Sequence, residues 1–192
     1  MPYQFSNLTV LVVESNNAMF DLTRGVLESF GIGQIVSAYN VAVGYQQFKE
    51  YKPDLVIIDW LDDQENGLTL TEKIRTSPDS PNPFVPIIMM TGYSQKRRVT
   101  LARDSGITEF VVKPFTAATL YKKIESIIEK PRNFVKSPGF FGPDRRRQTA
   151  EYTGNERRKR EQPPKKKARL SDIVKNMHDE QSNNSSKNEG QS

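Results

Sequence analysis

The chain has 192 residues and a formal net charge of +5, with one histidine and no cysteine. The lack of cysteine excludes disulfides and thiol chemistry, and a lone histidine, His178, argues against histidine catalysis or a histidine metal site. No apolar run is long enough to span a bilayer and the N-terminus lacks a signal-peptide pattern, so we expect a cytoplasmic protein. The length suits one domain and a tail.

Short apolar runs rich in Val and Ile alternate with segments of helical periodicity over the first 130 residues. Such runs are typical of strands buried on both faces of a parallel sheet. The alternation predicts one doubly wound α/β domain with a five-stranded parallel sheet. The expected strands comprise residues 10–13, 34–38, 55–58, 87–90 and 110–112.

The segments between these runs carry apolar residues three and four positions apart, as on one face of a helix. In the first helix we expect this face to contain Met19, Leu22, Val26 and Phe30, with Gly31 or Gly33 ending the helix. The second and fifth helices have suitable N-caps in Asn40 and Thr116. The expected apolar positions of the other four helices are residues 41–48, Leu70 and Ile74, Val99 and Ala102 before Gly106, and Leu120, Ile124, Ile127 and Ile128.

A polar residue directly follows four of the expected strands, namely Glu14, Asp59, Thr91 and Lys113. The carboxyl ends of parallel strands meet at one edge of the sheet, where ligands bind in such folds. A carboxylate, a hydroxyl and an ammonium group gathered there suit one anionic group beside a metal ion. Any one of these residues alone is common in turns, so the inference of phosphoryl chemistry depends on all of them occurring in register.

Four motifs share the order and spacing of one known family: residues 10–14, residues 53–60 followed by Gly67, residues 86–92 and residues 110–115. Together they resemble the receiver domains of two-component response regulators, and the stretch after Val112 is especially similar to CheY-like receivers. The resemblance implies a flavodoxin-like (βα)5 receiver at residues 1–130. It leaves residues 131–192 as a basic, low-complexity and mostly disordered tail.

The resemblance implies roles for the polar edge. Asp59 would be the phosphoacceptor, taking a phosphoryl group from the phosphohistidine of a histidine kinase or phosphotransfer protein. Thr91 and Lys113 would bind the phosphoryl oxygens. Phe110 would be the switch aromatic that couples the site to the surface of the fourth helix, fifth strand and fifth helix, where a protein target would bind.

The resemblance also implies Mg²⁺, held by Glu14, Asp59 and the backbone carbonyl of Leu61. The family has two adjacent acidic residues after the first strand, whereas this chain has Glu14 followed by Ser15. Mg²⁺ prefers hard oxygen ligands, usually carboxylates, so Ser15 should weaken metal binding and slow phosphorylation. We expect a working but weaker site; the alternative is a degenerate receiver that signals without phosphate.

Two bulky residues, Leu61 and Tyr93, come two positions after Asp59 and Thr91. The resemblance places them beside the path of the water that hydrolyses the phosphoryl group. Neither carries a carboxylate or an amide that could orient water, which implies a long-lived phosphoryl group. The other interpretation is that they only pack over the rim of the site.

Charge divides the chain. Residues 1–130 hold 13 basic and 15 acidic residues, whereas residues 131–192 hold 15 basic and 8 acidic ones. The tail is too poor in apolar residues to fold alone, although we expect Phe140 and Phe141 to pack back on the receiver. We expect the tail to bind anions through its arginines, namely Arg145, Arg146, Arg147, Arg157 and Arg158.

No helix-turn-helix pattern follows Glu129, and the tail has no catalytic constellation, so we expect neither a DNA-binding output domain nor an enzyme. Three interpretations of the tail remain open. Arginine-rich stretches on CheY-like chains resemble the Cle effectors of cyclic di-GMP; nucleic acid or an anionic membrane is a second ligand class. The third interpretation is a tether to a protein partner, since residues 170–178 have helical spacing.

The sequence therefore predicts a CheY-like response regulator of a phosphorelay, phosphorylated on Asp59 and signalling through protein interaction. The alternative is an effector whose arginine-rich tail binds cyclic di-GMP, nucleic acid or another anionic ligand on a degenerate receiver scaffold.

Overall fold

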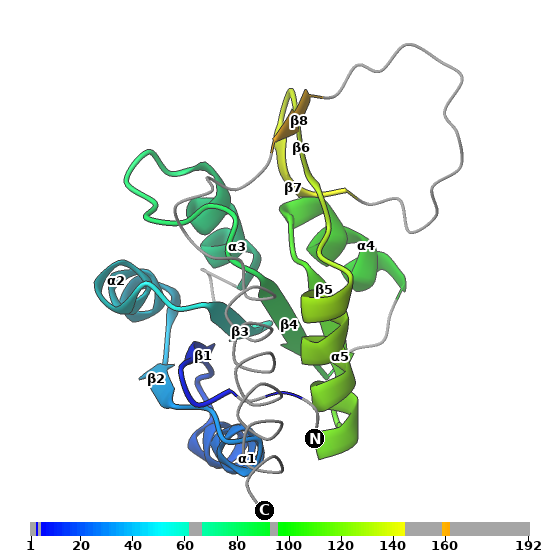
Figure 1. The fold of residues 1–192 in the computed structure, drawn as a ribbon. Helices are drawn as coiled ribbons and strands as arrows, with labels where there is room; N and C mark the ends of the chain where they lie inside the picture. Colours follow the sequence, from blue (N-terminus) through cyan, green and yellow to red (C-terminus); the bar gives the residue numbers. More distant parts are fainter. Residues whose placement is uncertain (1–2, 4, 62–66, 93–95, 145–158, 162–192) are drawn as a thin grey trace, which may run out of the picture.

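A five-stranded parallel sheet forms the centre of the molecule (Figure 1). The computed structural model describes residues 3, 5–61, 67–92, 96–144 and 159–161. The strand order is β2-β1-β3-β4-β5, which confirms the predicted doubly wound receiver fold. The strands are β1 (Thr9–Val13), β2 (Gln34–Ala38), β3 (Leu55–Asp59), β4 (Ile87–Thr91) and β5 (Glu109–Val112).

Five helices cover the two faces of this sheet (Figure 1). One core lies between the sheet and α1 and α5, and the other lies between the sheet and α2, α3 and α4. Successive strand residues point to opposite faces, so both cores take residues from the same strands, which explains the continuous apolar runs. The helices are α1 (Asn17–Ser29), α2 (Val41–Tyr51), α3 (Gly67–Thr76), α4 (Lys96–Ser105) and α5 (Ala117–Glu129).

The predicted helix boundaries are confirmed by the caps. The Oδ1 atom of Asn40 accepts the N–H of Val43 at 2.9 Å, and the Oγ1 atom of Thr116 accepts the N–H of Thr119 at 3.2 Å. Gly31 follows α1 with a φ of 79°, the left-handed conformation that favours glycine. No helix in the described part of the chain is both long and apolar enough to cross a membrane.

The prediction for the buried face of α1 is wrong at one residue. Leu22 is 50% exposed, whereas Thr23, Leu27 and Phe30 are buried. The buried residues are spaced i, i+4 and i+7, so the stripe that faces the sheet is centred one position further along the chain than expected. Val26 packs only at the margin of the core.

A second, antiparallel sheet follows α5 and lies beyond the ends of α3 and α4 (Figure 1). Its strands are β6 (Phe134–Ser137), β7 (Phe140–Pro143) and β8 (Lys159–Glu161), in the order β7-β6-β8. The ring centroids of Phe134 and Phe141 lie 5.1 and 5.3 Å from that of Phe84, which precedes β4. This confirms that Phe141 packs back on the receiver.

The position of this hairpin bears on the expected boundary at residue 130. The sequence interpretation treated residues 131–192 as a mostly disordered tail, and within that range the structure describes residues 131–144 and 159–161. Phe134 and Val135 are buried there as fully as core residues of the receiver. Ordered packing therefore continues past residue 130. The stability of truncated chains tests where the folded unit ends.

Candidate functional site

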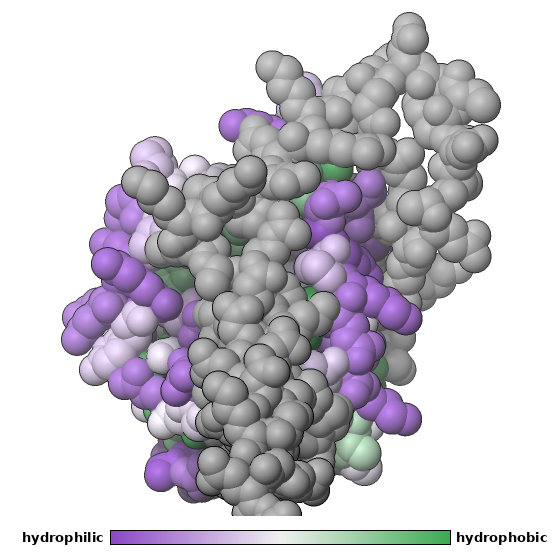
Figure 2. All heavy atoms as spheres, in the orientation of Figure 1, coloured by the Kyte–Doolittle hydropathy of each residue, from purple (hydrophilic) through white to green (hydrophobic). Residues whose placement is uncertain are grey.

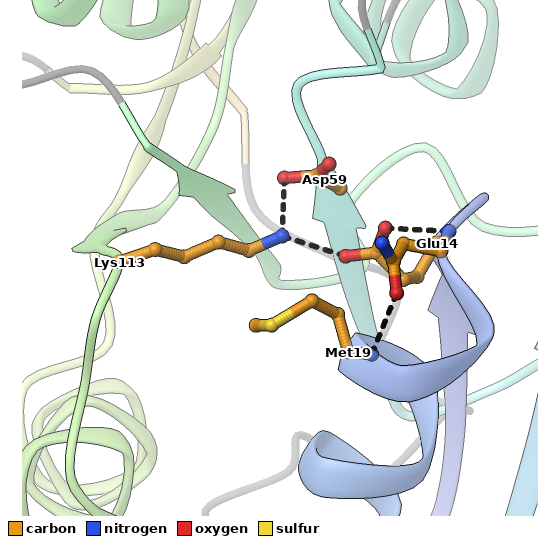
Figure 3. Close-up of polar contacts among 5 residues, drawn as sticks. Glu14, Met19, Asp59 and Lys113 are labelled. Carbon is orange, nitrogen blue, oxygen red and sulfur yellow. Dashed lines mark hydrogen bonds and ion pairs between the residues drawn. The ribbon is translucent and has the colours of Figure 1, made fainter.

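Three of the predicted site residues meet at the carboxyl edge of the sheet (Figure 3). Glu14 follows β1, Asp59 ends β3, and Lys113 follows β5. The Nζ atom of Lys113 lies 2.6 Å from Oε2 of Glu14 and 2.9 Å from Oδ1 of Asp59. The lysine side chain thus spans from the edge strand β5 to both carboxylates and places one positive charge between them.

Glu14 is the most deeply buried member of this cluster. Its side chain is 1% exposed, against 17% for Asp59 and 16% for Lys113. Its other oxygen, Oε1, accepts the N–H of Asn16 at 2.9 Å. A buried carboxylate is stable only where donors or a counter-charge replace water, and Glu14 has both.

The ammonium of Lys113 keeps its proton in this setting. Burial by itself lowers the pKa of Lys113, but hydrogen bonds and charge attraction from Glu14 and Asp59 outweigh burial and raise the pKa above its ordinary value. The cluster consequently presents a fixed positive charge beside Asp59, which suits an incoming anionic group.

Asn16 contributes to the site and was missed in the sequence interpretation. Besides donating its N–H to Glu14, it caps α1, because its Oδ1 accepts the N–H of Met19 at 3.1 Å (Figure 3). An asparagine directly before a helical pattern was the available signal. The residue thus fixes the start of α1 to the carboxylate of the site.

Two further predicted residues, Thr91 and Phe110, belong to the strands β4 and β5. Thr91 ends β4 and is fully buried, and its carbonyl accepts the N–H of Lys113 at 2.8 Å. Phe110, in β5, is partly buried against the core beneath α2, α3 and α4. Tyr93 and all five arginines expected to bind anions lie outside the described residues.

The backbone after β3 is tightly constrained. Leu61 has a φ of 51°, unusual for a branched residue, and its side chain is buried. The N–H of Gly67 donates to the carbonyl of Trp60 at 2.8 Å. A Cβ atom at Gly67 would collide with the carbonyl oxygen of Asp59 and come within 2.9 Å of Ile58. Glycine at this position therefore allows the start of α3 to approach the end of β3.

The donor set suits a magnesium ion only in part. The carboxylate of Asp59 and the backbone carbonyl of Leu61 are hard oxygen donors of the kind that Mg²⁺ prefers. Glu14 already uses both oxygens within the protein, and Ser15 is exposed. Among the described residues, no three acidic, histidine or cysteine side chains are grouped as a metal site. The residues thus fit a cation with few protein ligands.

Comparison with known sequences finds related proteins. The profile of the response regulator receiver domain matches residues 10–125. The chain is 27% identical to chemotaxis protein CheY-3 of Vibrio cholerae over 124 residues, which cover 65% of this chain and 94% of the relative. It is 30% identical to chemotaxis protein CheY1 of Helicobacter pylori over 122 residues, covering 63% and 97%.

Solved structures agree on the fold. The crystal structure of V. cholerae CheY4 superposes with a TM-score of 0.57 at 21% identity, covering 62% of this chain and 98% of that one. The receiver domain of a histidine kinase from Syntrophus aciditrophicus gives 0.57 at 23% identity, covering 65% and 92%. At these identities the likeness establishes the fold alone.

Proposed function

Because the chain belongs to the response regulator receiver family, we propose that it is a CheY-like response regulator of a phosphorelay, phosphorylated on Asp59. The phosphoryl donor is a histidine kinase or a phosphotransfer protein. The observation that carries this proposal is the 2.9 Å contact between Lys113 and Asp59. It joins a nucleophilic carboxylate to a fixed cation at the edge where ligands of this fold bind.

Each residue has a task in the transfer. An oxygen of Asp59 attacks the phosphorus of the phosphohistidine, and the bond to the imidazole nitrogen breaks as the imidazole leaves. Lys113 compensates the charge of the transferred group, and the hydroxyl of Thr91 donates to one of its oxygens. A magnesium ion, when bound to Asp59 and the carbonyl of Leu61, supplies further positive charge; Glu14 is the third candidate ligand, and Ser15 makes the binding weak.

The output is an interaction with a protein target on the surface of α4, β5 and α5. Leu101 of α4 and Val112 of β5 are 46% and 40% exposed and offer apolar contacts to this target. Phe110, in the same strand as Val112, connects this surface with the site. A change at Thr91 on phosphorylation would alter the packing of Phe110 and so bias the surface between two states.

Intact mass after incubation with acetyl phosphate and Mg²⁺ tests the proposal. We expect one added phosphoryl group in the native chain and none in Asp59→Asn. The matched control is Asp54→Asn, because Asp54 directly precedes β3 and its Oδ2 accepts the N–H of Thr9 at 3.0 Å. Absence of modification in the native chain, or its persistence in Asp59→Asn, would refute the assignment.

A second candidate function concerns the basic tail. Strand β8 pairs with β6 so that Lys159 stands opposite Lys136 and Arg160 opposite Val135. The backbone of the basic tail is thus paired with an ordered strand of the hairpin. This pairing supports a phosphate-bearing ligand for the tail, either cyclic di-GMP or nucleic acid, on a receiver that need not be phosphorylated.

A further inference from the structure

The contacts of Glu14 differ from those expected of a metal ligand. We infer that Glu14 is a positioning residue, which holds the ammonium of Lys113 beside Asp59 and acts on the site through that lysine rather than through the metal ion. The inference rests on the proposed function only for the role of Asp59. It assigns to the acidic residue after β1 a task that follows from the geometry of this chain.

The first support is the order of the distances. Lys113 lies closer to Glu14, at 2.6 Å, than to Asp59, at 2.9 Å. Glutamate is one methylene longer than aspartate, and this length lets a residue rooted at the end of β1 reach a lysine rooted beyond β5. The ion pair therefore depends on the reach of Glu14, the one acidic side chain that this chain keeps where its family has two adjacent ones.

The second support is that both carboxylate oxygens of Glu14 already accept hydrogen bonds within the protein. Lys113 occupies Oε2, the N–H of Asn16 occupies Oε1, and the side chain is 1% exposed. A metal ion that keeps several waters needs a ligand that solvent can approach, because Mg²⁺ gives up its hydration reluctantly. Asp59, at 17% exposure, meets this need better.

The third support is the charge balance. Lys113 is shared by two carboxylates, so the positive charge that a receiver site needs is already tethered to the protein. A metal ion bound to Asp59 would stand close to this ammonium, and like charges repel strongly where the site is shielded from water. Removing Lys113 should therefore strengthen Mg²⁺ binding for two reasons: it deletes a competing cation, and it frees the carboxylate of Glu14.

Mg²⁺ titration of five proteins tests this inference: the native chain, Glu14→Gln, Lys113→Met, the double variant of these two, and Asp59→Asn. The fluorescence of Trp60, the only tryptophan and the neighbour of Asp59, reports binding. We expect Lys113→Met to tighten Mg²⁺ binding by about tenfold or more. Glu14→Gln should weaken it by only about twofold when Lys113 is present but by about tenfold in the Lys113→Met background, as for a ligand set free.

A second measurement reports on Lys113 itself without any metal. Acetylation of lysines in the presence of EDTA, read by peptide mass spectrometry, should label Lys113 several-fold faster in Glu14→Gln, with Lys49, which pairs with Asp79, as the internal reference. The matched control is Glu109→Gln, because Glu109 is buried and its Oε2 lies 2.9 Å from Nζ of Lys123. That variant should expose Lys123 and leave Lys113 unchanged.

The inference is overturned if Glu14→Gln weakens Mg²⁺ binding as much as Asp59→Asn does while Lys113 is present, or if labelling of Lys113 does not rise. Should Glu14→Gln fold poorly, Glu14→Asp keeps the charge and shortens the reach, and it should still release Lys113. Neither measurement requires phosphorylation, so a failed phosphoryl transfer would reject the proposed function and leave this test intact.

Discussion

The guanidinium carbon of Arg75 lies 5.1 Å from the centre of the Phe134 ring. Arg75 is buried, its Nε donates to the carbonyl of Gly106 at 3.0 Å, and its Nη1 donates to the carbonyl of Pro83 at 2.7 Å. One side chain of α3 thereby joins the loop before β4, the turn after α4 and the first strand of the hairpin. Such a contact between a cation and an aromatic face is favourable, most of all where water is excluded.

The first prediction concerns the end of the folded unit. A chain ending at Lys130 should lose about 3–5 kcal/mol of unfolding free energy relative to one ending at Asp144, because it lacks the buried side chains of Phe134 and Val135 and leaves Arg75 without the ring that covers it. Urea denaturation followed by Trp60 fluorescence measures the difference. Equal stability of the two chains would mean that the receiver is complete at residue 130.

The hairpin shows which part of the fold the sequence pattern could not predict. The strands were predictable because continuous Val and Ile runs have few alternatives, and the same pattern placed Glu14, Asp59 and Lys113 at one edge of the sheet. The hairpin strands have only four residues each, and their stability depends on Phe84 and Arg75, which lie more than 45 residues earlier in the chain. No local pattern carries that information.

The same distinction applies inside the site. The identity of its residues followed from spacing and from the family resemblance, but the pairing of Lys113 with Glu14 depends on side-chain reach across the two strands, β3 and β4, that separate β5 from β1. Leu22 was misplaced because a single apolar residue fits two adjacent helix stripes equally well, and packing on the sheet decides between them. Sequence patterns predicted the location of the chemistry, and tertiary contacts determined its charge partners.

Magnesium affinity yields a second prediction. Ser15→Asp should tighten Mg²⁺ binding by about tenfold, because it restores a hard anionic ligand at the position that the family uses. Fluorescence titration of Trp60 measures the dissociation constant, and Ser15→Asn, of similar size but neutral, is the control. If Ser15→Asp binds Mg²⁺ no more tightly than the native chain, the weak binding at this site has a cause other than Ser15.

The lifetime of the phosphoryl group yields a third prediction. Leu61→Asn should speed its loss several-fold, because an amide can orient the attacking water and asparagine tolerates the left-handed backbone at this position better than leucine does. The decay of phosphorylated protein, followed by intact mass after removal of acetyl phosphate, provides the rate. An unchanged rate would favour the interpretation that Leu61 only packs at the site.

Close packing beside the phosphoacceptor yields a fourth prediction. Gly67→Ala should lower the unfolding free energy by about 1–3 kcal/mol, because the new methyl group meets the carbonyl of Asp59 and the side chain of Ile58. It should also slow phosphorylation more than Gly25→Ala, since a Cβ atom at Gly25 meets nothing within 4 Å. Similar phosphorylation rates in both variants would show that Asp59 does not depend on this contact.

The tail yields a fifth prediction. Replacing Arg145, Arg146, Arg147, Arg157 and Arg158 by alanine should abolish binding of anionic ligands while phosphorylation of Asp59 persists, because the receiver has its own core. Binding by the native chain should weaken steeply with salt, as each phosphate contact releases counterions. Calorimetry with cyclic di-GMP and with a single-stranded RNA separates the ligands: the dinucleotide should saturate stoichiometrically, whereas generic binding should grow with RNA length.

Strand pairing supplies a sharper version of this experiment. Glu161 stands opposite Phe134, and proline at position 161 would remove a backbone donor from β8. Loss of a negative charge alone would strengthen anion binding, so Glu161→Gln should bind at least as well as the native chain. If β8 organises the basic segment, Glu161→Pro should nevertheless bind several-fold more weakly than Glu161→Gln. Equal binding by these two variants would mean that the arginines act without the pairing of β8 to β6.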